Sequence, residues 1–246
     1  MMQVSAFPGV RLAACLALAA TVACGSGENV SRTPPPPASR TSIANEPVAA
    51  SQGDPRIVVL GDSLTAGMGL AAEDAYPAVL QRRLDGKGLK YDVINAGVSG
   101  DTSAAGLSRL DWALEGDVRV LILALGANDG LRGLPVSQLK DNLARIIERA
   151  LARGVTVVLA GMEAPPNWGD EYTKAFHGVY PALASQYHLA LVPFLLEGVA
   201  GIDRLNQRDG LHPTAEGDRI VADRVWSVLQ PIVERQTIRR EGAPGS

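Results

Sequence analysis

RIVVLGDSLT, the stretch Arg56–Thr65, places four large aliphatic side chains directly before a Gly-Asp-Ser turn. The apolar run Ile57–Leu60 does not alternate with polar residues, which is typical of a parallel strand covered on both faces. A serine just past the C-terminal end of such a strand, here Ser63, lies where open α/β sheets place their ligands. Gly, Asp and Ser are also common turn residues, so this stretch alone equally fits a plain turn. The rest of the chain decides between the two interpretations.

Apolar strands alternate with helical segments along the remainder of the sequence. We expect strands at residues 57–60, 92–95, 119–125, 155–160 and 190–192, and helices near residues 76–84, 103–114, 136–152, 171–187 and 213–229. Strict alternation favours a parallel sheet with helices on both faces. The sequence therefore predicts one α/β domain at residues 55–236, followed by a disordered tail at residues 237–246.

Composition and charge exclude several classes of function. The chain has 246 residues, of which 46% are hydrophobic and 20% charged, as in ordinary soluble proteins. A net charge of −3 gives no electrostatic reason to bind nucleic acid. The three histidines, His177, His188 and His212, show no metal-ligand spacing, and no nucleotide-binding glycine motif follows a strand. We therefore expect no metal and no cofactor, and we expect His177 and His188 to lie on the surface without an ordered carboxylate partner.

The first 54 residues have the pattern of an exported and anchored protein. An uncharged run too short to span a bilayer predicts a signal peptide at residues 1–23. The small residues before Cys24 resemble the lipobox of bacterial lipoproteins, with ordinary secretory cleavage nearby as the alternative. Residues 24–54 are rich in Pro, Ser and Thr and predict an extended linker. We expect a monomer in the bacterial cell envelope, lipid-anchored at Cys24 and facing the periplasm, or secreted.

Polar residues follow three of the predicted strands and gather again near the C-terminus. Gly61–Ser63 follows the first strand, Asn95–Gly100 the second and Gly126–Gly130 the third, whereas Asp209–Pro213 lies outside any strand. Parallel strands end at one edge of the sheet, so the segments that follow them can converge on one crevice.

The residue types in these blocks suit nucleophilic catalysis. A serine hydroxyl such as that of Ser63 needs a base, and His212 is the suitably placed candidate. Asp209 lies three residues before His212, close enough to fix the tautomer of the imidazole. Pro213 disfavours helical geometry at His212 and holds the imidazole in a loop.

A carbonyl attacked by a serine also needs hydrogen-bond donors for its developing negative charge. The backbone N–H groups of Ser63 and Gly100 and the side-chain amide of Asn128 are candidates. Gly97 is the other glycine that would allow close backbone approach. It lies nearer the strand, so the alternative is that Gly97 serves the turn alone.

Together the four blocks resemble the SGNH (GDSL) hydrolase family. They are Gly61–Thr65 (GDSLT), Gly97–Gly100 (GVSG), Gly126–Asp129 (GAND) and Asp209–His212 (DGLH), in the family's order. The resemblance covers about residues 56–232 and is strongest to the bacterial extracytoplasmic branch of thioesterases, lysophospholipases and arylesterases. It implies a flavodoxin-like three-layer α/β/α sandwich with a five-stranded parallel sheet.

The resemblance also implies roles for individual residues. Ser63 would be the nucleophile, with Asp209 and His212 as its triad partners. Gly100 and Asn128 would donate to the oxyanion together with the Ser63 amide, because in the family the donor is the glycine after the second-block serine.

The implied reaction is hydrolysis of a carboxylic ester or thioester of an acyl substrate, such as a lysophospholipid, an acyl thioester or an aryl ester, through an acyl-enzyme. Met162–Gly169 follows the fourth strand and suits a wall for an acyl chain, or equally a crossover loop packed on the sheet. Asp111 and Trp112 are further candidates to border the pocket. Two alternatives stay open: a carbohydrate O-deacetylase of the same family, and a non-catalytic envelope-binding lipoprotein.

Overall fold

The computed structural model of this chain describes residues 53–241. The expected signal peptide, Cys24, nearly all of the linker at residues 24–54 and the last five residues lie outside the described residues. None of the helices within the described range is both long and apolar enough to cross a membrane.

The centre of the fold is a sheet of five parallel strands in the order β2-β1-β3-β4-β5. The strands are β1 Arg56–Gly61, β2 Asp92–Gly97, β3 Val118–Ala124, β4 Thr156–Ala160 and β5 Ala190–Val192. The interior strands β1 and β3 are almost completely buried, whereas the edge strand β2 is largely exposed. This order is the flavodoxin-like one, so the α/β fold predicted from the alternating pattern is confirmed.

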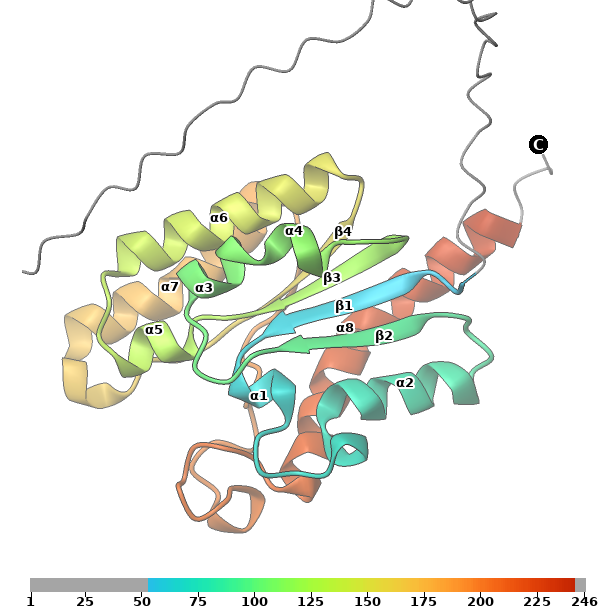
Figure 1. Cartoon of the computed structure of the whole chain (residues 1–246). Helices are drawn as coiled ribbons and strands as arrows, with labels where there is room; N and C mark the ends of the chain where they lie inside the picture. Colours follow the sequence, from blue (N-terminus) through green and yellow to red (C-terminus); the bar gives the residue numbers. More distant parts are fainter. Residues whose placement is uncertain (1–52, 242–246) are drawn as a thin grey trace, which may run out of the picture. The chain divides into compact units, whose positions relative to one another are not determined.

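Helices cover both faces of the sheet, giving three layers (Figure 1). The long helices are α2 Tyr76–Gly86, α6 Val136–Ala152, α7 Asp170–Tyr187 and α8 Ala215–Glu241, and the short ones are α1 Ser63–Ala66, α3 Ser103–Ser108, α4 Leu110–Ala113 and α5 Ala127–Leu131. Helices α3, α6 and α7 pack as neighbours on one face, and α2 and α8 pack on the other. The buried stripe of α6 is the one that its sequence period predicts: Leu139, Leu143, Ile146, Ile147 and Ala150.

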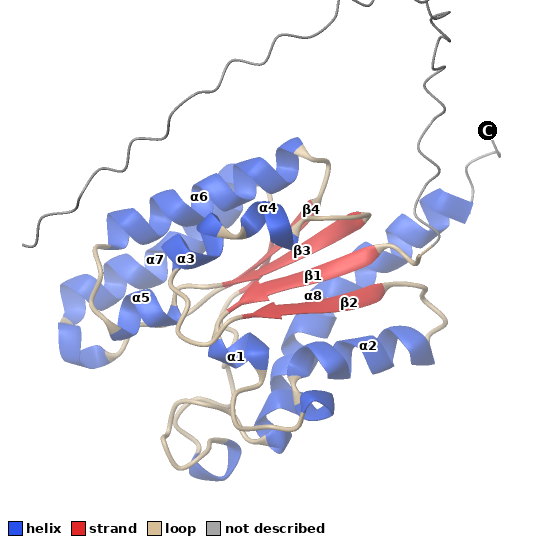
Figure 2. Ribbon diagram, in the orientation of Figure 1, coloured by secondary structure: helices blue, strands red, loops and turns tan. Residues whose placement is uncertain are grey.

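The loops of the described residues also contain three short 3₁₀ helices, η1 Ala72–Asp74, η2 Pro166–Trp168 and η3 Asp203–Leu205. Each strand runs toward the same edge of the sheet, and the loops that follow the strands gather there (Figure 2). The loop between β5 and α8 is the longest of these, and it returns to the edge of the sheet at which Ser63 lies. This edge therefore holds the blocks of polar residues described above.

Two predicted boundaries are wrong. The helix expected at residues 103–114 is broken into α3 and α4 at Arg109, whose backbone (φ −106°, ψ 9°) leaves the helical geometry. The last helix continues through residues 237–241, which were predicted to be disordered. The buried side chains of Ile232 and Val233 continue its apolar side past Pro231, and Gln236 donates a hydrogen bond to Thr156 on β4 (3.0 Å). These contacts hold the helix up to Gln236, and beyond it the Arg240 guanidinium lies over the ring of Tyr91 at 5.9 Å.

Candidate active site

Ser63 is the first residue of helix α1, directly beyond the end of β1. Asp62 caps this helix, because its Oδ1 accepts a hydrogen bond from the Leu64 N–H at 3.0 Å. A side chain at Gly61 would collide with Thr65, whose Oγ1 lies 1.9 Å from the position of a Cβ. The glycine thus lets α1 fold back tightly on the strand, which leaves the serine hydroxyl at the rim of the sheet.

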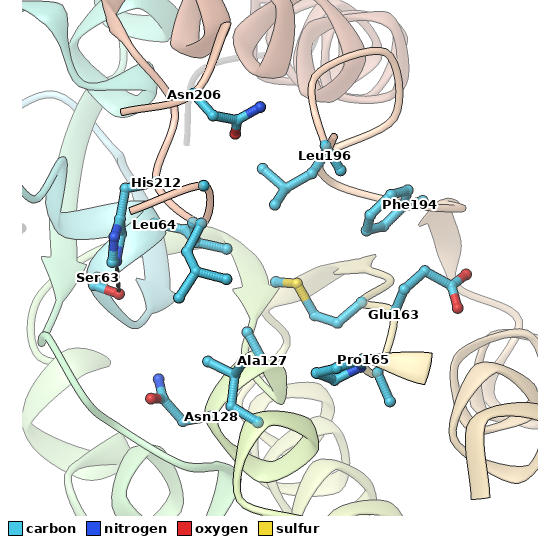
Figure 3. A pocket seen from close by; sticks show the side chains of 16 residues that line it. Ser63, Leu64, Ala127, Asn128, Glu163, Pro165, Phe194, Leu196, Asn206 and His212 are labelled. Atoms are coloured by element: carbon cyan, nitrogen blue, oxygen red, sulfur yellow. Dashed lines mark hydrogen bonds between the residues drawn. The ribbon is translucent and has the colours of Figure 1, made fainter. Parts of the chain in front are cut away.

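His212 and Asp209 reach Ser63 from the loop that precedes α8. The His212 Nε2 lies 2.9 Å from the Ser63 Oγ, and its Nδ1 lies 2.7 Å from the Asp209 Oδ2 (Figure 3 shows the Ser63–His212 contact). The other carboxylate oxygen of Asp209 accepts the backbone N–H groups of Leu211 (2.9 Å) and His212 (3.1 Å). With Asp209 on Nδ1, the imidazole presents Nε2 as an acceptor to the serine hydroxyl.

Asp209 remains ionised well below neutral pH. The hydrogen bonds from the His212 side chain and from the backbone N–H groups of Leu211 and His212 lower the pKa of the Asp209 carboxyl to about 2. The surrounding loop is fixed by a bridge between Asn206 and Pro213 and by a hydrogen bond from the Gln207 side chain to the Met68 carbonyl (2.7 Å). The second contact ties this loop to the segment just after α1.

Asn128 lies at the start of α5, beyond the end of β3, and faces the nucleophile segment. Its Nδ2 donates to the Asp101 carbonyl at 3.0 Å and to the Asp62 Oδ2 at 3.2 Å. Both partners are acceptors, which fixes the orientation of the amide. The Nδ2 group of Asn128 is thus engaged within the protein, and its longer contact is the one to Asp62.

The structure requires glycine at the two glycine positions of the second block for different reasons. Gly100 has a φ of +86° at the third position of a turn that closes with a hydrogen bond from the Asp101 N–H to the Val98 carbonyl (3.1 Å). Residues with side chains rarely adopt this conformation. At Gly97 a Cβ would come within 2.3 Å of the Ala66 nitrogen, so this glycine lets the strand approach α1. Gly97 therefore serves packing.

Asp62 is fully buried beside the nucleophile. Burial raises the pKa of its carboxyl to about 6, against the opposing effect of the hydrogen bonds from Leu64 and Asn128. Just behind it, the buried Asp129 accepts the Ser103 N–H at 2.8 Å and the Ser103 hydroxyl at 2.6 Å. These contacts hold the start of α3 against the start of α5.

An apolar cavity of about 300 Å³ opens beside Ser63 and His212. Its walls come from α1 and α5, from the loop after β4 and from the long connection between β5 and α8 (Figure 3). They are lined by Leu64, Ala127, Leu131, Met162, Glu163, Ala164, Pro165, Phe194, Leu196, Ala200, Asn206, Gly210 and Leu211 together with Ser63, Asn128 and His212. Gly100 is not among the lining residues, although it adjoins Asp101 behind Asn128.

The wall expected from Met162–Gly169 is half correct. Residues 162–165 line the cavity, whereas Trp168 packs near Gly133 and Tyr172, outside it. The expectation that Asp111 and Trp112 border the pocket is wrong. Asp111 forms ion pairs with Arg149 on α6 and with Arg153 directly after it, and Trp112 is exposed beside the edge strand.

The expectation for His177 is also wrong in one respect. Its Nδ1 lies 2.6 Å from the Glu163 Oε1, so it has a carboxylate partner at the rim of the cavity. The spacing of 14 residues across a loop and a helix gave no sign of this pair in the sequence. His188 ends α7 in a left-handed conformation, away from the site.

Phe194, Leu196 and Ala200 were missed as pocket residues. They follow the three-residue strand β5, and no motif in the sequence marks the loop as part of a site. Among residues 53–241, no group of His, Cys, Asp and Glu side chains has the arrangement to hold a metal ion.

Comparison with known proteins agrees with this geometry. The model of the GDSL-like Lipase/Acylhydrolase family matches residues 59–220. The esterase TesA of Pseudomonas aeruginosa is 44% identical over 178 residues, which are 72% of this chain and 89% of that protein. The thioesterase 1/protease 1/lysophospholipase L1 of Escherichia coli K12 is 36% identical over 182 residues, 74% of this chain and 86% of that protein.

Solved structures give the same result. The crystal structure of TesA superposes with a TM-score of 0.69 at 45% identity and covers 72% of this chain and 98% of that chain. The psychrotrophic esterase EstA from Pseudoalteromonas, in a structure inhibited by monoethylphosphonate, gives a TM-score of 0.70 at 32% identity and covers 74% and 100%. This chain belongs to the GDSL-like lipase/acylhydrolase family and is a carboxylic ester hydrolase.

Proposed function

We propose that this enzyme hydrolyses esters and thioesters of acyl groups through an acyl-enzyme formed on Ser63. The observation that carries the proposal is the unbroken chain of contacts from the Ser63 hydroxyl through His212 to Asp209, at 2.9 and 2.7 Å. His212 takes the hydroxyl proton as Ser63 attacks the carbonyl, and then gives it to the leaving alcohol or thiol. A water molecule, deprotonated by the same imidazole, releases the acid and restores the serine.

The negative charge that develops on the attacked carbonyl oxygen needs donors near Ser63. In this proposal they are the N–H groups of Ser63 and Gly100 and one N–H of Asn128. Asn128 shares a wall of the cavity with Ser63 and His212, which supports its part in the oxyanion hole. Its longer hydrogen bond, to Asp62, is exchanged for the bond to the oxyanion.

The acyl group enters the apolar part of the cavity. Its volume of about 300 Å³ is at the lower end of small-molecule sites and exceeds what a two-carbon acyl group fills, given about 30 Å³ for one water molecule. This favours medium-length acyl chains over a deacetylase. The names esterase, arylesterase and thioesterase/lysophospholipase of the relatives support acyl esters and thioesters as the substrate class.

The test is the hydrolysis of p-nitrophenyl esters from acetate to palmitate by the wild type, Ser63→Ala and a matched control. Ser227→Ala is the control, because Ser227 is exposed on α8 and bonds only to the Arg224 carbonyl. We expect a maximum at medium chains, loss of all activity in Ser63→Ala and unchanged activity in Ser227→Ala. Activity on acetate alone would point to a deacetylase, and ester hydrolysis that persists in Ser63→Ala would refute the assignment of the nucleophile.

We further propose that the enzyme works outside the cytoplasm, as a lipoprotein anchored at Cys24. The support is the signal-peptide pattern of residues 1–23 and the small residues before this cysteine. Cys24→Ser is expected to move the enzyme from the membrane fraction to the soluble fraction of the cell envelope with its esterase activity retained. Membrane association that persists in Cys24→Ser would overturn the anchor.

A further inference from the structure

Arg109 forms a bridge between the nucleophile segment and the second block. Its Nε donates to the Asp101 Oδ2 at 2.7 Å, and its Nη2 donates to the Gly61 carbonyl at 2.9 Å. Both side chains of the ion pair are largely buried, with 17% of Arg109 and 13% of Asp101 exposed. One guanidinium thus joins the residue two positions before Ser63 to the residue directly after Gly100.

Asp101 is connected to both proposed donors outside the nucleophile itself. It follows Gly100 in the chain, and its N–H closes the turn in which Gly100 takes a φ of +86°. Its carbonyl accepts one N–H of Asn128 at 3.0 Å. Fixing Asp101 therefore fixes the direction of the Gly100 amide and the plane of the Asn128 amide at the same time.

The cost of burying Arg109 argues that its main effect is on geometry. Its Nη1 is buried without a hydrogen-bond partner among the described residues. A buried ion pair contributes little net stability when its groups are incompletely hydrogen-bonded, because desolvation offsets the attraction. The planar guanidinium can hold two acceptors in a fixed relative position, which an ammonium group cannot do.

We propose that Arg109 is a positioning residue of the oxyanion hole, acting through Asp101 on Gly100 and Asn128. The break between α3 and α4 is at Arg109 itself, and the side chain reaches from this break to the end of β1. Because an oxyanion exists only after attack, misplaced donors weaken the transition state and leave substrate binding intact. This proposal rests on the proposed function, since it concerns the same reaction.

The experiment measures kcat and KM on one medium-chain p-nitrophenyl ester for Arg109→Lys and Arg109→Met, alone and combined with Asn128→Ala. We expect Arg109→Met to lower kcat about 10²-fold, as for a misplaced catalytic group, with KM within about threefold of the wild type. Arg109→Lys keeps the charge but loses one of the two bonds, and we expect a loss of about tenfold in kcat. In the Asn128→Ala background, the further loss from Arg109→Met should shrink to about tenfold, because the part that acts through Asn128 is already lost and only the part that acts through Gly100 remains.

Arg83→Met is the matched control for the loss of an arginine bridge. Arg83 also joins a carboxylate and a carbonyl, those of Asp223 and Ala222, but it links α2 to α8 far from Ser63. The kcat of the Arg83→Met variant per folded molecule is expected to equal that of the wild type. Thermal melting of every variant gives the folded fraction, and if Arg109→Met does not fold, Arg109→Lys carries the test.

Two results would overturn the inference. One is an unchanged kcat per folded molecule in the Arg109 variants, and the other is a loss that is fully additive with that of Asn128→Ala. The first result would make Arg109 a structural residue only, and the second would show that Arg109 does not act through Asn128, contrary to the proposal. Failure of the proposed function would look different, because the wild type itself would then lack activity that depends on Ser63.

Discussion

The polar half and the apolar half of the cavity are built in different ways. The polar half consists of Ser63, Asn128 and His212, which lie in short blocks held by several hydrogen bonds each. The apolar half comes from the loops after β4 and β5, where Phe194 and Leu196 are half-buried and make their contacts through apolar surface. In the proposed reaction, hydrogen-bonded polar side chains therefore lie where charge develops, and apolar side chains line the space for the acyl chain.

The two halves of the cavity therefore have separate effects on the rate of reaction and on the selectivity for acyl chains. Substitutions in the polar half should lower kcat for every substrate, because they act on the reacting atoms. Substitutions in the apolar half should change the preference among acyl chains, because each methylene contributes only about 1–3 kcal/mol of discrimination. The following predictions separate the two halves.

The largest effect is expected when the base is removed. His212→Ala should lower kcat on the order of 10⁵-fold on all chain lengths, since the imidazole moves the proton in both steps. Asp209→Asn should cost about 10³–10⁴-fold, because the wrong tautomer of the imidazole is then favoured. His188→Asn, a histidine replacement on the far side of the fold, is the control. Steady-state kinetics on acetate and octanoate esters measure kcat for all three variants. A loss in His212→Ala that is confined to one chain length would contradict the division of the cavity into a reacting half and a selective half.

A smaller loss is expected for the amide donor. Asn128→Ala should lower kcat by roughly 10²–10³-fold, with KM little changed, as for other lost oxyanion donors. Asn128→Asp also tests the loss of the amide donor, because a carboxylate cannot donate a hydrogen bond, and it does so with almost no change in side-chain volume. An unchanged kcat in both variants would remove Asn128 from the oxyanion hole.

In the apolar half the expected effect depends on the substrate. Phe194→Ala should lower kcat/KM on octanoate esters by about tenfold and leave acetate within about twofold, because only the longer chain loses contact area. Trp168→Ala is the matched control: this aromatic side chain lies in the same region but does not line the cavity. Equal losses on acetate and octanoate would show that Phe194 acts on the reaction and not on selectivity.

The smallest effect concerns the support beneath the nucleophile helix. The Asp218 carboxyl accepts a hydrogen bond from the Tyr76 N–H (2.9 Å), and the Tyr76 hydroxyl contacts Thr65 of α1 at 2.7 Å. Burial raises the pKa of the Asp218 carboxyl to about 7. The Asp218 carboxyl binds its proton more tightly in the folded state than in the unfolded chain. Protonation of Asp218 therefore stabilises the folded state at acidic pH, and this stabilisation is lost as the pH rises from about 4 to about 7.

Asp218→Asn keeps the acceptor and removes the charge. Urea unfolding at pH 5 and pH 8 should show a flatter pH dependence and a gain at pH 8 on the order of 1–3 kcal/mol. Asp223→Asn, an exposed carboxyl on the same helix, should leave the pH dependence as in the wild type. A pH dependence in Asp218→Asn as steep as in the wild type would contradict the burial of a charge there.

The polar half could be predicted from the sequence because its chemistry needs particular residue types next to strand ends. Ser63, Asp209 and His212 come together as expected, since parallel strands deliver their following loops to one edge. The apolar half could be predicted only in part. Phe194 and Leu196 are ordinary apolar residues in a loop, and only the tertiary structure decides which side of that loop faces the cavity.

Helix boundaries and long-range pairs were less accessible to prediction. The break at Arg109 depends on bonds to Asp101 and to Gly61, the latter 48 residues away. The extension of α8 beyond Leu229 begins with the buried side chains of Ile232 and Val233 and the hydrogen bond from Gln236 to Thr156 on β4, which local propensity does not contain. The pair of Glu163 and His177 likewise exists only because α7 packs beside the loop after β4.

Covalent labelling can show whether Ser63 is the nucleophile on which the proposed reaction depends. The full-length enzyme is incubated with a fluorophosphonate, digested and mapped by mass spectrometry, beside Ser63→Ala and Ser227→Ala. We expect one adduct per chain on the peptide that contains Ser63, present in Ser227→Ala and absent in Ser63→Ala. An adduct on another residue, or labelling that persists in Ser63→Ala, would contradict this assignment.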